Sequence, residues 1–484
     1  MTTAPAEPHP RLAVAVLCAA GIVVALMQTI IVPLIPLLPS LLSTSATNSS
    51  WTLTITLLVG AVVTPISGRL GDMFGKRTVL VASLIAVAVG SAVCALSAGF
   101  LIFLLGRGLQ GLGIGTIAVG ISLMRDIVPP ERLASSIGAM SASLGVGGSL
   151  GLPFSAAIAQ QVSWHALFWT SSAVAVIAAA AVVATVPVRG VATGGRFDAL
   201  GAVGLTVLLT CLLLPVSKGA EWGWTAPITL VMFAGFVVSA LLWWRWEQRS
   251  PNPLVDLRLN LLLRPVLLTN LASIATGFAF YAMQMIPIQI LMAPSAAMDA
   301  GSLGVGMTML VASLLLMPGG LVMFAFSYVS AAMTARYGAR VSLASGVVVI
   351  GLGYTLLLTM IAGPWRAGWG WLLAINILVG AGLGIAYSAM PALIMQWVPV
   401  SHTGEANGVN ALMRSVGTSL ATAVVGMILA ASTVAVGAGS RVQHVPTSGA
   451  YAWAAAIPLA VCVVSALTAL AIPRRAPVEE EQIV

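Results

Sequence analysis

The stretch GRLGDMFGKR, from Gly68 to Arg77, decides the fold, because it places four charged residues in ten between two long apolar segments. Charged residues make up only 7% of the 484-residue chain. An apolar segment of about 20 residues can cross a membrane as a helix, and charges collect where such helices leave the membrane. The stretch therefore predicts a chain that crosses a membrane on both sides of a short, water-exposed loop.

The composition of the whole chain agrees with this interpretation. Hydrophobic residues make up 59% of the sequence and the mean hydropathy is +1.04, both far outside the range of soluble proteins. We therefore expect an all-α polytopic membrane protein. The four histidines are scattered and the four cysteines lie in apolar runs, so the sequence predicts no metal site.

Proline, glycine and charge clusters divide the sequence into fourteen predicted transmembrane helices. The first is too long for the core of a signal peptide, so we expect it to be retained. The predicted spans are 12–38, 51–68, 78–97, 100–123, 134–158, 165–186, 200–217, 227–244, 265–291, 303–328, 342–362, 371–394, 406–432 and 452–472.

Lysine and arginine are distributed unevenly between the two sides that these spans define. Sixteen of the 21 fall on the side of both termini, three on the other side, and Arg107 and Arg414 lie within spans. Short cytoplasmic loops retain positive charge, so we expect a multi-pass protein of the cytoplasmic (inner) membrane with both termini in the cytoplasm. This bias explains the net charge of +8 without a nucleic-acid partner.

The opening stretch has a fainter counterpart in the second half of the chain. AAMTARYGAR, residues 331–340, keeps a glycine and a final arginine at the positions of Gly75 and Arg77. An internal repeat of this kind is typical of secondary transporters. It predicts two pseudo-symmetric six-helix bundles, residues 1–190 and 263–484, separated by two inserted helices in residues 191–262.

These features together resemble the major facilitator superfamily, and specifically its fourteen-span drug:proton antiporter branch. The opening stretch fits the loop motif of that family, and RGLQGLG, residues 107–113, fits its fourth-span motif. EWGW at 221–224 and NPLVDLRL at 252–259 are similar to the middle region of the branch. The resemblance implies a secondary active transporter, not an enzyme, that uses the proton gradient as its energy source and needs no cofactor.

The resemblance implies a gating role for the opening stretch. The candidate gating residues are Gly68, Asp72, Gly75, Lys76 and Arg77. In the family, the aspartate approaches the N-terminus of a helix in the other half, where the helix dipole favours an anion. Here that target is the start of span thirteen, near Thr403 to Glu405. The alternative is that Asp72 pairs only with basic residues of its own loop.

Four residues are candidates for proton coupling or substrate contact: Arg107, Gln110, Glu405 and Arg414. Arg107 should face the protein interior, and a purely structural role stays open. Thr403, Asn407, Asn410 and Arg414 share one helical face, which should line either a cavity or a helix interface. The candidate cavity residues are Gln28, Asn270, Gln284, Asn407 and Asn410, together with Arg107 and Arg414.

Glycines at 145, 147 and 151 in span five predict close helix packing, and the resemblance places this helix at the sliding interface between the halves. This span keeps Gly151 of the antiporter motif but has its proline at Pro153. The first span has Met27 where the branch usually carries an acid.

No carboxylate falls securely within a predicted span. This favours a neutral, anionic or weakly basic lipophilic substrate over a permanent cation. The sequence thus predicts a monomeric, proton-driven exporter of small lipophilic compounds, of the multidrug efflux type associated with drug resistance. Export of an endogenous metabolite or lipid is the alternative. A membrane-embedded enzyme or a sensor is disfavoured, because acids and histidines do not cluster and no loop exceeds about twenty residues.

Overall fold

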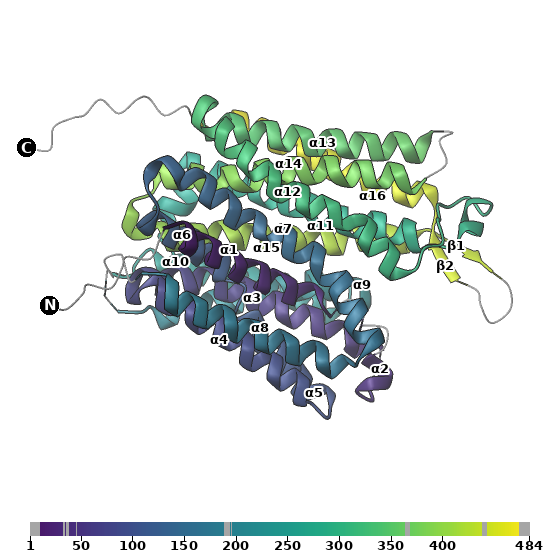
Figure 1. Cartoon of the computed structure of the whole chain (residues 1–484), viewed down its shortest axis with the longest axis horizontal. Coiled ribbons are helices and arrows are strands. Elements are labelled where there is room, and N and C mark those ends of the chain that lie inside the picture. Colours follow the sequence, from purple (N-terminus) through teal and green to yellow (C-terminus); the bar gives the residue numbers. More distant parts are fainter. Residues whose placement is uncertain are drawn as a thin grey trace, which may run out of the picture.

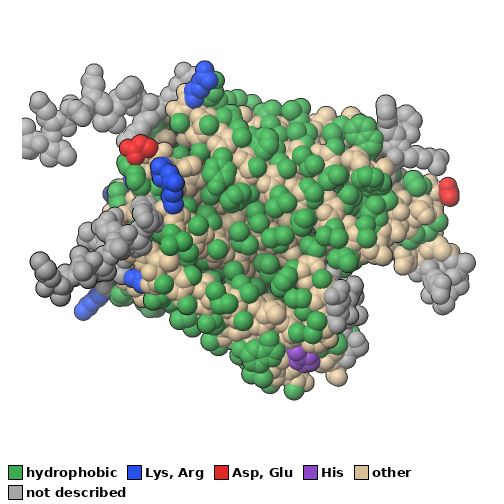
Figure 2. Space-filling view, in the orientation of Figure 1, with side chains coloured by type: hydrophobic (Ala, Val, Ile, Leu, Met, Phe, Trp, Pro, Cys, Tyr) green, Lys and Arg blue, Asp and Glu red, His purple; other side chains and the backbone are tan. Residues whose placement is uncertain are grey.

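The computed structural model describes residues 10–31, 34, 38–44, 46–187, 194, 196–363, 368–437 and 443–473. Within these ranges, fourteen helices are long and apolar enough to cross a membrane, which confirms the predicted number. Hydrophobic side chains cover the middle of the molecule, and the lysines and arginines visible on this face lie toward one end (Figure 2). The chain is therefore an all-α polytopic membrane protein.

The helices run side by side, and α1 begins at the same end of the bundle as α16 finishes (Figure 1). The first part of the chain forms α1 (Pro10–Thr29), α2 (Leu38–Leu41), α3 (Ala46–Phe74), α4 (Lys76–Leu96), α5 (Phe100–Gly111), α6 (Thr116–Ile127), α7 (Pro130–Gln161) and α8 (Trp164–Thr185). The middle forms α9 (Ala199–Trp222), α10 (Pro227–Glu247) and the short π-helix η2 (Arg258–Leu262).

The last part of the chain forms α11 (Arg264–Met292), η3 (Ser295–Met298), α12 (Met309–Tyr337), α13 (Ala339–Ala362), α14 (Trp369–Trp397), η4 (Val400–His402), α15 (Thr403–Ala431) and α16 (Ser448–Leu470). Between α15 and α16, β1 (Thr433–Val436) and β2 (Gln443–Pro446) pair antiparallel, with Thr433 opposite Pro446. This hairpin lies at the end of the bundle opposite the start of α1 (Figure 1).

Two predicted spans differ from the observed helices. The helix α1 ends at Thr29, not at residue 38. Proline at position 33 lacks the N–H needed to continue an α-helix. The predicted fourth span is broken into α5 and α6 at residues 112–115, where Gly113 and Gly115 disfavour a continuous helix.

The hydrophobic core is divided in the way that two bundles require. One large cluster joins buried residues between Ala13 and Val186, with Met395, and a second joins residues between Ala272 and Ile472. A third cluster packs α9 and α10 against α3 and α15. The inserted helices therefore cover a seam where the two halves meet. The predicted domain boundary at residue 190 lies outside the described residues.

Two helix pairs, α3 with α15 and α7 with α12, make the main contacts between the halves. The pair α7 and α12 meets at glycines on both sides: a side chain on Gly145 would overlap Met323, and one on Gly320 would overlap Ser149. Gly145 thus lies between the halves as predicted. Gly147 and Gly151 do not, because they pack against Ile22 and Thr29 of α1. For these two glycines the prediction was wrong, since a helix with glycine on several faces packs closely on several sides.

Candidate functional site

The charged stretch around Asp72 is not the loop that its composition predicted. The helix α3 continues to Phe74 and α4 restarts at Lys76, so only Gly75 separates them, with φ of 98°. A side chain is strained in that conformation, which explains the glycine. The carboxylates Asp72, Asp126, Glu131, Glu247 and Glu405 likewise lie in the terminal turns of helices, which corrects the expectation that no acid falls within a span.

Asp72 joins the two halves of the protein at this end. Its side chain is buried, and its carboxylate oxygens accept hydrogen bonds from the backbone N–H groups of Gly404, at 3.2 Å, and Glu405, at 2.9 Å. These N–H groups lie in the first turn of α15, where the helix dipole favours an anion. A side chain on Gly68 would overlap the carbonyl of Gly404, so the glycine permits this approach. The contact is the one expected from the sequence, while its gating role stays a prediction.

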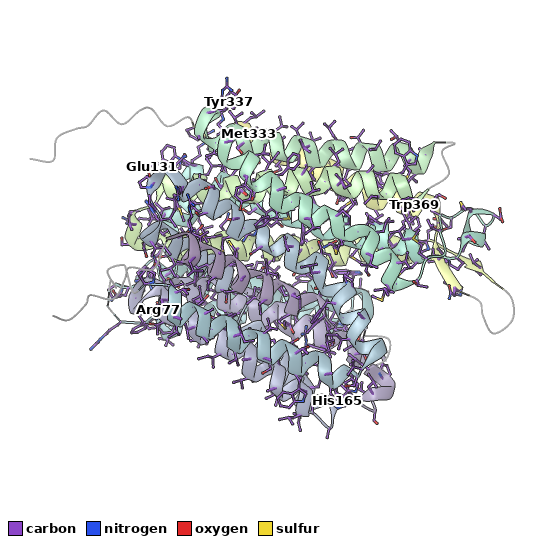
Figure 3. The ribbon with its side chains drawn as sticks, viewed as in Figure 1. Arg77, Glu131, His165, Met333, Tyr337 and Trp369 are labelled. Atoms are coloured by element: carbon purple, nitrogen blue, oxygen red, sulfur yellow. The ribbon has the colours of Figure 1, made fainter. Side chains whose placement is uncertain are left out.

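The basic residues of the stretch hold α3 and α4 within the first half. Lys76 is buried, and its Nζ lies 2.8 Å from Oδ2 of Asp126 and 3.9 Å from Oδ1 of Asp72. Arg77 donates to the carbonyl of Val183 and lies at the end of the molecule that also carries Tyr337 (Figure 3). Asp72 therefore makes both the contact across the halves and the local ion pair that the sequence left as alternatives.

Glu405 connects α15 to the segment that follows the inserted helices. Its Oε1 accepts from the backbone N–H of Asp256, at 2.5 Å, and from Nδ2 of Asn260, at 2.8 Å. Its Oε2 lies 3.1 Å from Nδ1 of His402 and 3.9 Å from Arg69 of the first half. The sequence reasoning missed Asn260, because a lone asparagine in an apolar linker carries no pattern.

A buried chain of amides continues from Asn260 along the interface of α11 and α15. Asn270 donates to the carbonyl of Asn260, at 3.1 Å, and Asn410 donates to Oδ1 of Asn270, at 3.0 Å, and to Ser273. Asn407 donates to the carbonyl of Thr403 in its own helix. The predicted cavity residues Asn270, Asn407 and Asn410 do not line the central cavity in this conformation.

Arg107 is fully buried and holds three helices together. It donates to the carbonyls of Met27 and Thr52, each at 3.2 Å, and to Oε1 of Gln110, at 2.5 Å. Gln110 in turn donates to Ser91 at 2.7 Å. Carbonyl and amide oxygens thus solvate the guanidinium inside the membrane region. Arg107 faces the interior as predicted, but it is not among the residues that line the central cavity.

A cavity of about 290 Å³ lies between the halves. Three of the residues that the sequence predicted for the cavity line it: Gln28, Gln284 and Arg414. Its wall is lined by Ala25, Gln28, Thr29, Leu53, Leu57, Thr64, Ile114, Ile117, Leu144, Gly148, Leu152, Phe280, Tyr281, Gln284, Met285, Ile288, Gln289, Met309, Tyr387, Ala411, Arg414, Ser415 and Thr418. Most of these side chains are apolar, and none of the described lining residues is a carboxylate.

The aromatic residues of this wall were not predicted. The Cζ atom of Arg414 lies 5.0 Å from the ring centroid of Tyr387, and the rings of Tyr387 and Phe280 are 5.9 Å apart. The only available signal was a single tyrosine in the glycine-rich stretch GAGLGIAYSAM, residues 380–390, and such a residue is usually explained by packing alone.

Two helical bundles around a shared cavity, with one end held shut between them, are the architecture of a secondary transporter. Comparison with known proteins agrees. Residues 17–324 and 302–483 match the sequence profile described as Major Facilitator Superfamily. The chain belongs to this family.

Several bacterial relatives share about a quarter of their residues with the chain. It is 27% identical over 413 residues to the uncharacterized MFS-type transporter Rv1877 of Mycobacterium tuberculosis. The matching region covers 84% of this chain but only 58% of Rv1877. It is 26% identical to the multidrug resistance protein Stp of the same species, over 75% of this chain and 66% of Stp. The same identity relates it to the probable actinorhodin transporter of Streptomyces coelicolor, over 77% of this chain and 64% of that protein.

Solved structures of the same family share the fold. The human organic anion transporter MFSD10 covers 96% of this chain with a TM-score of 0.63 and 14% identity, and 100% of that structure is matched. The proton:xylose symporter XylE covers 96% of both chains with a TM-score of 0.65 and 12% identity. At these identities the similarity concerns the fold.

Proposed function

We propose that the protein is a proton-driven, alternating-access exporter of small lipophilic compounds in the cytoplasmic membrane. The central observation is the cavity of about 290 Å³ between the halves, with a largely apolar wall and no acid among its described lining residues. Such a wall favours compounds that partition into lipid and disfavours permanent cations, which need a compensating negative charge. The name of the multidrug resistance protein Stp supports export.

The contacts at the Asp72 end support alternating access. There the carboxylate of Asp72 binds the start of α15, and Arg69 lies 3.9 Å from Glu405 across the halves. Several cavity residues instead lie far along their helices from this end, including Leu53 at the start of α3 and Thr418 in the middle of α15. With the Asp72 end in the cytoplasm, this conformation is closed to the cytoplasm.

The same contacts offer a route for proton coupling. Protonation of Asp72 would remove the negative charge that the N-terminus of α15 attracts and would weaken closure. The ionisable groups facing it are Lys76 from α4 and Glu405 from α15, and Asp126, Arg69 and His402 surround these two. We assign the proton to this cluster because the cavity wall carries no described carboxylate.

Export of a compound that the cell itself makes is the second candidate function. The similarity to a probable actinorhodin transporter favours it, since that name gives one particular compound as the cargo. Both functions require the same cavity and the same gate, so they differ only in the compound carried.

An efflux assay in an exporter-deficient bacterium tests the proposal. We expect the wild-type chain to lower the accumulation of neutral or anionic lipophilic dyes, and an uncoupler to abolish this effect. A matched permanent cation should accumulate equally with and without the protein. Unchanged accumulation of every dye, with the protein present in the membrane, would contradict export. Efflux that persists with the uncoupler would contradict proton coupling.

A further inference from the structure

Arg414 carries the most unusual chemistry in the cavity. It is 8% exposed and lines the cavity, yet its guanidinium makes no hydrogen bond to any residue that the structure describes, and its Nη1 is buried without an acceptor. Within the part of the chain that the structure describes, the charge lies over the ring of Tyr387. Arg107, by contrast, donates to two carbonyls and an amide, although its Nη2 is also buried without an acceptor among the described residues. A buried cation without an oxygen partner is costly, so an oxyanion bound at this site would stabilise it.

The other polar groups of the cavity can support an anion only in part. The hydroxyls of Thr64, Ser415 and Thr418 already donate to carbonyls of their own helices, so they present oxygen acceptors to the cavity. The other donors among the described lining residues are Arg414, the side-chain amides of Gln28, Gln284 and Gln289, and the hydroxyls of Tyr281 and Tyr387. The guanidinium can bind a carboxylate through two parallel hydrogen bonds, which an ammonium group cannot do.

Charge and apolar surface lie on opposite sides of the cavity. Arg414, Tyr387, Phe280 and Gln284 all belong to the C-terminal half. The N-terminal half contributes mainly aliphatic side chains: Leu53, Leu57, Ile114, Ile117, Leu144 and Leu152. A compound that fills this cavity therefore meets a cation on one side and a hydrocarbon wall on the other.

We propose that Arg414 is the recognition site for a carboxylate-type oxyanion at one end of an otherwise apolar or aromatic substrate. The acidic group binds the guanidinium that Tyr387 supports from one face, and the apolar body packs against the N-terminal half. One compound then contacts both halves, which is what a substrate that controls alternating access must do. This inference concerns the substrate class of the proposed exporter, but binding itself does not depend on export.

Equilibrium binding to the purified full-length protein in lipid nanodiscs tests this site. The probes are 1-pyrenebutyrate, its neutral amide and a pyrenebutyl-trimethylammonium cation, with empty nanodiscs as background. Because a hydrogen bond to a charged group changes affinity by about tenfold or more, we expect the wild type to bind pyrenebutyrate at least about tenfold more tightly than the amide. Arg414→Gln should remove this preference and leave the affinity for the amide unchanged. Arg414→Lys should keep part of it.

Arg336→Gln is the matched control, because Arg336 is exposed at the end of α12 and its loss should change none of the three affinities. A preference for the amide or the cation in the wild type would overturn the inference. So would a preference for pyrenebutyrate that survives Arg414→Gln, or a loss of amide binding in both Arg414 variants, which would show a structural role.

Proteoliposome transport of the same probes separates this inference from the proposed function. Binding of pyrenebutyrate that depends on Arg414, without transport of any probe, would support the site and contradict export. Transport of the amide without any preference for the acid would support export and contradict the site.

Discussion

Replacing Asp72 with asparagine should open the end of the protein that Asp72 now holds shut. The substitution keeps the size of the side chain and removes its charge. In the wild type both carboxylate oxygens accept backbone N–H groups, from Gly404 and Glu405, in a buried position. Asparagine offers one acceptor oxygen, and its NH₂ group faces the second N–H, so one hydrogen bond is replaced by a repulsion between donors.

The size of the effect follows from these contacts. A hydrogen bond to a charged group contributes about 1.5–3 kcal/mol, and an anion at a helix N-terminus about 0.3–2 kcal/mol when partly buried. Losing one such bond and the charge, with the other bond retained in weaker form, should destabilise the closed conformation by about 2 kcal/mol. Since 1.4 kcal/mol is a factor of ten, the ratio of closed to open molecules should fall by about 30-fold.

Distances between two spin labels measure this ratio directly. Phe74 and Tyr337 suit labelling, because they are 59% and 57% exposed and end α3 in one half and α12 in the other. Tyr337 lies at the same end of the molecule as Arg77 (Figure 3). The four native cysteines are first replaced. We expect a short distance in the wild type and a substantial longer-distance population in Asp72→Asn.

Asp299→Asn is the control. Asp299 is exposed next to η3, so this substitution removes the same charge without touching a contact between the halves. It should leave the distances unchanged. The same distribution in Asp72→Asn as in the wild type would refute the reasoning, because the bonds to α15 would then contribute nothing to closure.

Two further substitutions test the packing and the charge burial separately. Gly68→Ala should weaken the same closure without changing any charge, because the added methyl group meets the carbonyl of Gly404. Its transport rate should fall at unchanged membrane abundance, whereas Gly426→Ala in α15, whose added methyl group meets no atom within 4 Å, should transport normally. Arg107→Leu should lower the melting temperature of the purified protein, because it leaves the carbonyls of Met27 and Thr52 without these donors at a cost of about 1–3 kcal/mol each. An unchanged melting temperature would contradict the structural role of Arg107.

The number and class of the helices could be predicted from the sequence because membrane insertion depends on local hydropathy. The Asp72 contact was also predictable, since the motif fixes which residue approaches a helix start. The ends of the helices were harder to predict from the sequence. Lys218 illustrates the reason: hydropathy placed it outside a span, yet it is buried within α9, 2.9 Å from Glu221 and 4.9 Å from the ring centroid of Trp51. A hydropathy scale assigns each charged residue a fixed value and takes no account of the partner that permits its burial.

The polar row on α15 shows what helical periodicity cannot predict. Spacing correctly places Asn407, Asn410 and Arg414 in one helix. It cannot say what each meets, because that depends on the neighbouring helix at that level. Asn410 donates a hydrogen bond to the side-chain amide of Asn270 at the helix interface, whereas Arg414, one turn further, lines the cavity. A residue of the helix interface and a residue of the cavity wall therefore lie on the same face of one helix.

The first turn of α15 also explains why the inserted helices belong to the mechanism of closure. Its backbone binds Asp72 of the first half, while the side chain of Glu405 binds the backbone of Asp256 and the amide of Asn260, which follow the insert. Any motion that separates α15 from α3 must either break the bonds to Asp256 and Asn260 or carry this linker along. Because these acceptor oxygens are buried and charged, breaking the bonds without replacement is costly. The linker should therefore move with α15, and the seam that opens should lie between α3 and the unit formed by α15 and the linker.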